Sequence, residues 1–284
     1  MTPLITLTAA AGAAVLYASG SLQIKRGLSQ GASVRRTIAV TNVAMALWAL
    51  PLFWVSRGAF DWQSWFVAIA AGVALFFGRI LSVKALEVGD LSIVGPLLGL
   101  KTLLVAVFSF VFGQSEPSAG LWLATGLATV GVVLLQRGPR QLSRGRLISA
   151  GYAAGASVLF AACDILVVEA RGQLGIGWLS PTLFVTVALL IPLLGRLPKP
   201  EPAARKPMYL GSVVMGFQTS LVILLIGITG EAVLINIVYA TRSLWSVVID
   251  RFYGRGAGVV AFFRQRMLGA ALLLAAIAVV IFYR

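Results

Sequence analysis

The chain has 284 residues, of which 59% are hydrophobic and only 11% are charged, whereas a soluble domain is about 45–50% apolar and about 25% charged. With a mean hydropathy of +0.95, this composition excludes an ordinary soluble domain and indicates a multi-pass membrane protein. The net charge of +14 does not indicate nucleic-acid binding here, because the basic residues cluster between apolar segments as topology signals. We expect a protein of the bacterial inner (plasma) membrane whose partners are the lipid bilayer and a small-molecule substrate, as a monomer or homodimer.

Ten apolar runs follow one another along the chain, each long enough to cross a bilayer as a helix of about 17–25 residues. The hydrocarbon core holds no water to satisfy backbone groups, so these runs are expected to be helical. The predicted fold class is all-α integral membrane with ten transmembrane helices. The predicted spans are 4–24, 37–56, 63–86, 91–112, 119–136, 147–169, 178–195, 208–228, 232–250 and 266–283.

The two halves of the chain resemble each other. "AAGAAVLYA" at 10–18 matches "AAGASVLFA" at 153–161 at seven of nine positions, and "VGDLSIVGPLLGLKT" at 88–102 aligns with "TGEAVLINIVYATRS" at 229–243. Five helices in each half would reverse the orientation of the second copy. Chance similarity between apolar stretches is the alternative. The pattern predicts one integrated membrane domain made of a repeat at 1–140 and an inverted repeat at 141–284, as in secondary transporters.

Two cations occupy equivalent positions deep in the predicted helices. The second alignment places Lys101 on Arg242, and each is followed by a hydroxyl residue, Thr102 or Ser243. Ten residues into a helix corresponds to a depth of about 15 Å, the middle of a hydrocarbon core of about 30 Å. A charge at that depth costs about 2.5–3.5 kcal/mol on insertion scales and generally marks a functional site.

Further polar residues are predicted near this depth. Helix 9 carries a polar stripe that includes Asn236 and Tyr239, while Arg79 and Asp164 lie within helices 3 and 6. One interpretation is a structural ion pair of Asp164 with Arg242 or Arg79. The other is an anion-binding centre, because three deep cations outnumber one deep acid, with Asp164 as a coupling residue or ion-pair partner. The predicted substrate-binding residues are Lys101, Arg242, Arg79, Tyr239, Asn236, Ser243 and Thr102.

The residue inventory argues against an enzyme. The chain has no histidine, and Cys163 is its single cysteine, so the sequence predicts no disulfide, no metal site and no cofactor. No nucleophile stands beside a base in a recognisable arrangement, and no catalytic residue is expected.

The segments "GQSEPSAGLWLATGLATVGVVLL" (113–135), "RSLWSVVIDRFYG" and "RQRMLGAALLLAAIAVVI" resemble the EamA-like branch of the drug/metabolite transporter superfamily. The resemblance covers nearly the whole chain as two five-helix repeats, and Glu116 falls at the family's acidic position. In the second repeat "GRGAGVV" follows Gly254, so that acid is absent. Because the superfamily's sugar-phosphate transporters look similar in placing cations on helices 4 and 9 around a phosphate, the resemblance implies this role for Lys101 and Arg242.

The sequence favours a secondary transporter of small organic metabolites, expected to be anionic with a carboxylate or phosphate group. It would work by alternating access around a midplane site between the repeats. A proton-coupled exporter of drugs, cations or amino acids is the first alternative, with Asp164 as the coupling acid. A translocase of a lipid-linked phosphate is the second alternative, since the same cations would serve it.

Basic residues are distributed unequally between the two sides of the predicted membrane. Sixteen of the 23 Lys and Arg residues lie in the 1–2, 5–6, 7–8 and 9–10 connections, and only Arg57, Arg171 and Arg284 lie on the opposite side. The positive-inside rule then places both termini outside the cytoplasm. The family resemblance implies cytoplasmic termini instead.

We predict that a topology reporter fused after Arg284 is extracytoplasmic, because the basic loops are retained in the cytoplasm. The measurement is the activity of paired reporters, one active only in the cytoplasm and the other only outside it. A cytoplasmic signal would show that the orientation of the family holds and that the loop charges do not set it.

Overall fold

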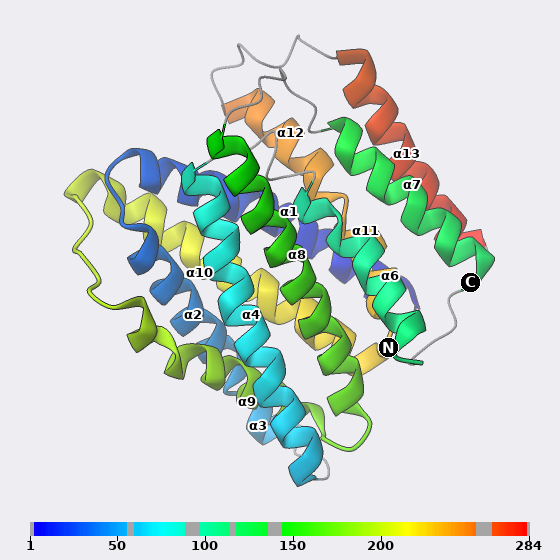
Figure 1. The fold of residues 1–284 in the computed structure, drawn as a ribbon, viewed down its shortest axis with the longest axis horizontal. Coiled ribbons are helices and arrows are strands. Elements are labelled where there is room, and N and C mark those ends of the chain that lie inside the picture. The colour runs from blue at the N-terminus through cyan, green and yellow to red at the C-terminus, as the bar shows by residue number, and fades with distance from the viewer. Residues whose placement is uncertain are drawn as a thin grey trace. The chain divides into compact units, whose positions relative to one another are not determined.

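The structure is a computed structural model that describes residues 3–55, 60–88, 97–113, 118–135, 144–253 and 263–282. Within these ranges it is helical and contains no strand (Figure 1). The first half forms α1 (Pro3–Ser29), α2 (Val34–Ala49), α3 (Leu52–Val55), α4 (Trp62–Val88), α6 (Lys101–Val111) and α7 (Ala119–Leu135). The second half forms α8 (Arg144–Arg171), α9 (Ile176–Leu189), the 3-10 helix η1 (Ile191–Leu194), α10 (Pro202–Thr229), α11 (Ala232–Tyr239), α12 (Arg242–Tyr253) and α13 (Phe263–Phe282).

The predicted fold class, an all-helical membrane protein with several spans, is confirmed. Seven of the described helical segments are long and apolar enough to cross a membrane, and Leu97–Val111 and Ala119–Leu135 are shorter apolar helices. Each predicted span overlaps described helix, although residues 91–96 of the fourth lie outside the described part. The exact number of ten crossings stays a prediction.

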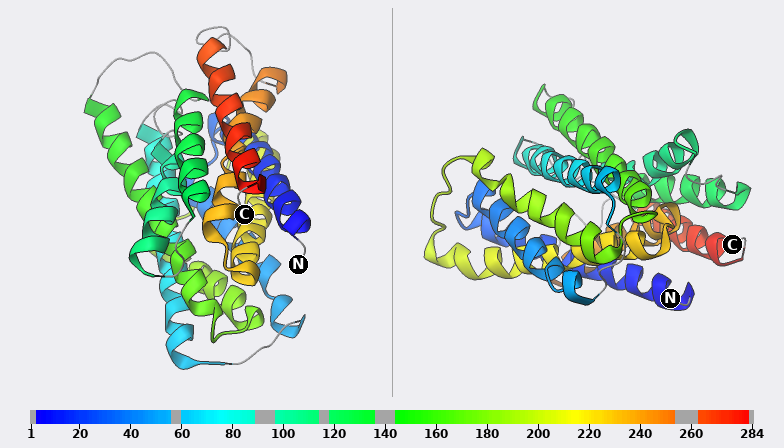
Figure 2. Two further views of the ribbon diagram at one scale, coloured as in Figure 1. Left: turned by 90° about the vertical axis from the view of Figure 1, so that its right-hand side faces the viewer. Right: turned by 90° about the horizontal axis from the view of Figure 1, so that it is seen from below.

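The chain forms two compact units. Unit 1 comprises Met1–Phe76 and Leu166–Gly230, and unit 2 comprises Phe77–Ile165 and Glu231–Arg284. In unit 1, α10 packs along α1 and α2, while α9 contacts α2 and α3; in unit 2, α7 packs along α13 and α6 (Figures 1 and 2). Each unit combines residues from both sides of position 140, so the repeats at 1–140 and 141–284 remain a proposal about sequence symmetry.

Several predicted spans are interrupted, and two of the interruptions lie at prolines. Helix α2 ends at Ala49, just before Pro51, and α9 gives way to the 3-10 helix that contains Pro192. Proline lacks the N–H that continues a helix and disfavours helical geometry in the residue before it. The third interruption, between α11 and α12, lies beside Arg242 and has no proline.

Glycines allow the principal helix pairs to approach closely. A Cβ at Gly211 of α10 would lie 2.7 Å from the backbone nitrogen of Ile24 in α1. A Cβ at Gly269 of α13 would lie 2.6 Å from the carbonyl oxygen of Gly131 in α7. In lipid, where apolar burial drives helix association weakly, such small-residue contacts supply dispersion and close packing.

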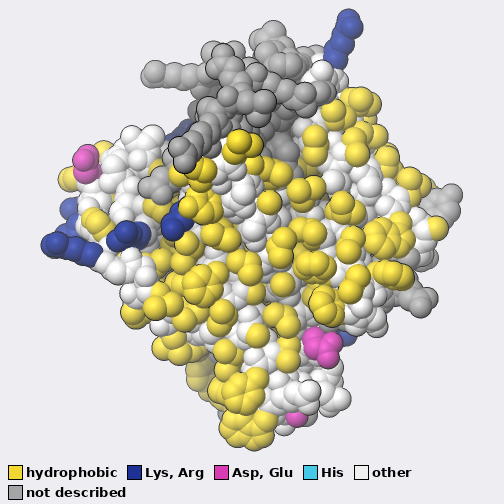
Figure 3. All heavy atoms as spheres, in the orientation of Figure 1, with side chains coloured by type: hydrophobic (Ala, Val, Ile, Leu, Met, Phe, Trp, Pro, Cys, Tyr) yellow, Lys and Arg dark blue, Asp and Glu magenta, His cyan; other side chains and the backbone are white. Residues whose placement is uncertain are grey.

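The outer surface fits a lipid environment. Hydrophobic side chains cover much of the face in view, with Lys and Arg at its margin (Figure 3). Leu189 is 73% exposed and Phe282 is 81% exposed, which would be unfavourable in water over a large contiguous area. These side chains are expected to contact acyl chains.

Arg171 closes the C-terminal end of α10 within unit 1. Its Nε donates to the carbonyl of Gly227 and its Nη2 to that of Ile228, both at 2.9 Å. These carbonyls belong to the last turn of α10, which has no helical N–H partners of its own. Gly230 follows with φ +74°, a left-handed cap, so a cation and a glycine together terminate the helix.

We predict that Gly230→Ala lowers the unfolding free energy of the purified protein by about 1–2 kcal/mol, the cost of a left-handed residue with a Cβ. The added Cβ would also lie 2.6 Å from Nη1 of Arg171. Thermal unfolding in detergent measures the effect. Gly12→Ala is the matched control, since no atom lies within 4 Å of a Cβ there; an equal loss in both variants would contradict the argument.

Candidate functional site

A buried ion pair lies inside unit 2. The Nζ atom of Lys101 on α6 is 2.8 Å from Oδ2 of Asp164 on α8. Lys101 is 8% exposed and Asp164 is 1% exposed, so both charges have lost nearly all contact with solvent. One interpretation of the sequence paired Asp164 with Arg242 or Arg79; the structure shows Lys101 as an ion-pair partner, which the sequence did not predict. Helix spacing gave the depth of each charge, but it could not tell which helix lies opposite α8.

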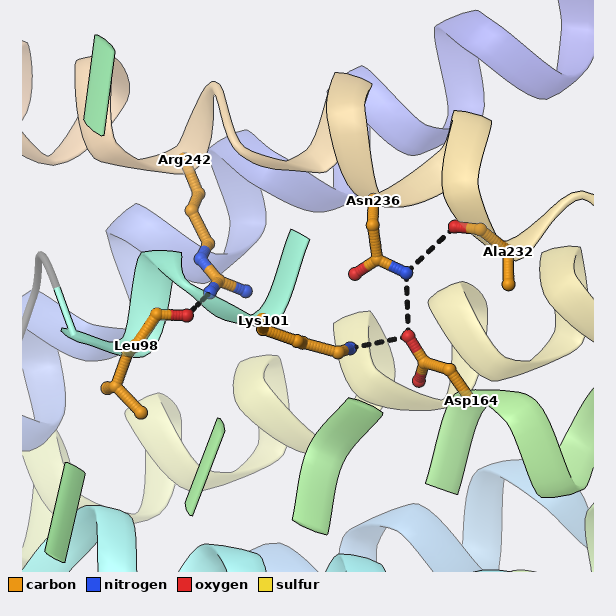
Figure 4. A network of polar contacts seen from close by, with 6 residues as sticks. All are labelled: Leu98, Lys101, Asp164, Ala232, Asn236 and Arg242. Atoms are coloured by element: carbon orange, nitrogen blue, oxygen red, sulfur yellow. Dashed lines mark hydrogen bonds and ion pairs between the residues drawn. The ribbon is translucent and has the colours of Figure 1, made fainter. Parts of the chain in front are cut away.

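Asn236 on α11 completes the surroundings of this carboxylate. Its Nδ2 donates to Oδ2 of Asp164 at 2.6 Å and to the carbonyl of Ala232 at 2.9 Å (Figure 4). A buried carboxylate needs hydrogen bonds as well as a counter-charge to offset its lost hydration. The amide supplies such a bond, so Lys101, Asp164 and Asn236 form one network from three helices.

Arg242 lies close to this network but is directed elsewhere. Its Nη2 donates to the carbonyl of Leu98 at 3.4 Å, while Lys101 extends toward Asp164 (Figure 4). Its guanidinium carbon is 4.4 Å from the centre of the Tyr239 ring, a distance typical of a cation–π contact. Arg242 is half-buried, so the ring and the backbone carbonyl hold a cation that keeps some exposure.

The two cations begin their helices in the same way. Lys101 is the first residue of α6 and Arg242 is the first residue of α12. The preceding residues are Leu100 and Thr241, and each N–H bonds to the carbonyl three positions back, on Leu97 at 3.2 Å or Val238 at 3.1 Å. This is the tighter 3-10 pattern, and it falls at positions that the sequence alignment makes equivalent.

The side chain of Thr241 strengthens the second of these turns. Its hydroxyl donates to the carbonyl of Val238 at 2.7 Å, and Ser246 donates to the carbonyl of Arg242 at 2.8 Å. Hydroxyl groups that bond backbone carbonyls compete with regular helical bonding and often bend a helix. The predicted span 232–250 is therefore two helices, α11 and α12, joined at the site.

The structure brings most of the predicted site residues together in unit 2. Thr102 and Ser243 are buried directly beside the two cations. Arg79 lies on α4 in the same unit. The carbonyl of Leu98 was missed in the sequence, because a backbone acceptor leaves no signal in side-chain type.

Two cavities lie in unit 1, and none of the residues that line them belongs to the polar network of unit 2. One, of about 400 Å³, is mainly apolar and is bordered by Phe53, Trp65 and Trp178. The other, of about 310 Å³, is polar and is bordered by Asp61 and Glu169 among others. The backbone N–H of Ser64, with its hydroxyl, holds the pKa of Asp61 below its usual range, so this carboxylate is ionised at the start of α4. Within the described residues no cluster of three or more metal-binding side chains occurs.

The helical membrane fold and the buried charged network define a class, the multi-span membrane proteins that carry polar groups inside the bundle. Residues 4–137 match the model of the EamA-like transporter family, in agreement with the predicted resemblance to the drug/metabolite transporter superfamily. This part of the chain is therefore similar to a family whose members are membrane transporters.

A solved structure titled "Crystal structure of protein" has the same fold. It superposes with a TM-score of 0.75 over 98% of this chain and 97% of that chain, at 14% sequence identity. Comparison with curated proteins gave no match. The structural likeness establishes the fold, and the substrate has to be argued from the site.

We predict that Lys101→Gln lowers the unfolding free energy by about 3–5 kcal/mol, because it leaves a buried carboxylate without its cation. The double variant Lys101→Gln/Asp164→Asn removes both charges and should recover most of the loss. Chemical unfolding of the purified variants measures the difference. Equal stability of the single and double variants would show that the loss does not come from an unpaired Asp164 carboxylate.

Proposed function

We propose that the protein is a secondary transporter of small organic anions carrying a carboxylate or phosphate group. The observation that carries the proposal is the equivalent placement of Lys101 and Arg242, each the first residue of a helix after a tightened turn. The N-terminal end of a helix bears a partial positive charge. A cation at that position adds a full charge to a place already favourable to anions.

The two cations offer different kinds of contact to such an anion. Arg242 presents a planar guanidinium that is supported from one side by the Tyr239 ring, and a guanidinium suits the two oxygens of a carboxylate or phosphate. Lys101 provides a compact charge that is engaged with Asp164. Arg242 is therefore the principal anion-binding residue in this proposal and Lys101 the second.

The proposed transport mechanism rests on the predicted inverted repeats. Inverted repeats with interrupted helices at the midplane are typical of alternating-access transporters, and the interruptions before Lys101 and Arg242 fall at equivalent positions. In this proposal the substrate binds between the repeats, and the site opens to one side of the membrane at a time. The surplus of deep cations disfavours a cationic substrate.

We predict that Arg242→Gln reduces anion uptake into proteoliposomes about ten- to hundredfold, the value of a charge-assisted hydrogen bond of about 1.5–3 kcal/mol. Arg242→Lys should recover only part of the activity, because an ammonium cannot form the forked contact. The measurement is uptake of radiolabelled lactate, succinate and inorganic phosphate.

Lys25→Gln is the matched control, since Lys25 is an exposed cation near the end of α1, and its uptake should equal that of the native protein. Proteoliposomes that contain the native protein and transport cationic drugs but none of the anions would contradict the proposal. Unchanged anion uptake by Arg242→Gln would remove Arg242 from the site.

A further inference from the structure

We propose that Asp164 is an internal anion that occupies Lys101 while the site is empty and releases it on taking up a proton, so that anion binding is coupled to binding of about one proton. This inference rests on the proposed function, because it assigns a coupling step to the same site. It starts from the observation that the second cation of the site is already engaged by a carboxylate 2.8 Å away.

The charge balance of the buried network supplies the reason. With Lys101 and Asp164 almost fully buried, an anion that binds Arg242 and also reaches Lys101 would have to share that ammonium with the Asp164 carboxylate, an arrangement that opposes binding. A proton on Asp164 removes this repulsion. The network then holds Lys101 with the substrate anion beside a neutral carboxyl group, and its net charge is the same before and after binding.

Asn236 can form hydrogen bonds with Asp164 in both its ionised and its protonated form. Its amide donates to Oδ2 of the carboxylate at 2.6 Å and also to the carbonyl of Ala232. A neutral carboxyl group retains an acceptor oxygen for this amide, and its new O–H can donate to the amide oxygen. A cationic residue in this position would oppose protonation, whereas an amide permits it.

Other charged groups lie on further helices of unit 2. Arg79 lies on α4, and Arg242 on α12 is directed to Leu98 over the Tyr239 ring. Glu231 precedes α11, one residue before Ala232. The entering anion adds a negative charge beside Lys101 and Asp164. In this proposal the uptake of a proton by Asp164 is thus linked to the binding of the substrate anion.

In this step the proton binds one carboxylate oxygen of Asp164, and no covalent bond other than that O–H forms or breaks. The ammonium of Lys101 exchanges one anionic partner for another. A monovalent anion and a proton then cross together without net charge. The direction of transport follows the combined gradients of the two.

The test first screens lactate, succinate, sulfate and inorganic phosphate for thermal stabilisation of the purified full-length protein. Proton uptake is then measured calorimetrically in buffers of different ionisation enthalpy, with lactate or sulfate, whose charge is constant near neutral pH. The native protein should take up about one proton per anion, and its affinity should fall about tenfold per pH unit over the pH range in which that proton is taken up.

Asp164→Asn imitates the protonated state and should bind the anion without proton uptake and without this pH dependence. Glu169→Gln is the matched control, because Glu169 is an exposed acid five residues further along α8, and it should retain the native proton uptake. If Asp164→Asn does not fold, the double variant Lys101→Gln/Asp164→Asn takes its place and should bind more weakly, again without a proton.

The outcomes separate this inference from the function on which it rests. If none of the four anions binds the native protein, the proposed function and the coupling step are both overturned. If an anion binds and Arg242→Gln weakens it, but the native protein takes up no proton, only the coupling step is overturned. Proton uptake that persists in Asp164→Asn also rejects Asp164 as its site.

Discussion

The cost of placing a charge in a low-dielectric interior governs the centre of unit 2. Asp164 is 1% exposed, and an isolated carboxylate at that burial would be prohibitively unfavourable. The ammonium of Lys101 and the amide of Asn236 compensate it at 2.8 and 2.6 Å. The network forms only when α6, α8 and α11 pack in one relative position. The ion pair therefore constrains helix packing as well as compensating the buried charge.

A buried ion pair is weak evidence of stabilisation, because apolar residues of similar volume often replace one without loss. Its presence in a chain that is only 11% charged is better explained by a requirement for charge at this place. The tightened turns before Lys101 and Arg242 agree with this explanation. Each gives up regular helical bonding beside a cation, a local cost that an ordinary packing helix would avoid.

Much of the fold could be predicted from the sequence because hydropathy is a long-range average that single residues scarcely disturb. The runs at 63–86 and 119–136 correspond closely to α4 and α7. The division of 232–250 into α11 and α12 was not predicted, since hydropathy is insensitive to a turn stabilised by the Thr241 hydroxyl. The proline-linked interruptions at Pro51 and Pro192 had a visible cause in the sequence.

The residues of the candidate site could be predicted from the sequence, but their contacts could not. Residue type and depth singled out Lys101, Asp164, Asn236 and Arg242, because polar groups are costly in lipid wherever they occur. The choice of Lys101 over Arg242 as the partner of Asp164 depends on which helix faces α8, and one sequence contains no information on that. The internal alignment gave equivalence between Lys101 and Arg242, but equivalence does not specify contact.

The two equivalent cations differ in chemistry, and the difference matches their surroundings. Arginine stays charged under all relevant conditions, and its flat guanidinium lies on the Tyr239 ring at 4.4 Å. Lysine is a compact charge that one carboxylate oxygen can satisfy, as Asp164 does. A symmetric ancestor with the same residue at both positions would offer two identical charges. In the proposed mechanism, one cation is permanent and supported by a ring and the other is matched to an internal acid, so that the site would respond to both an anion and a proton.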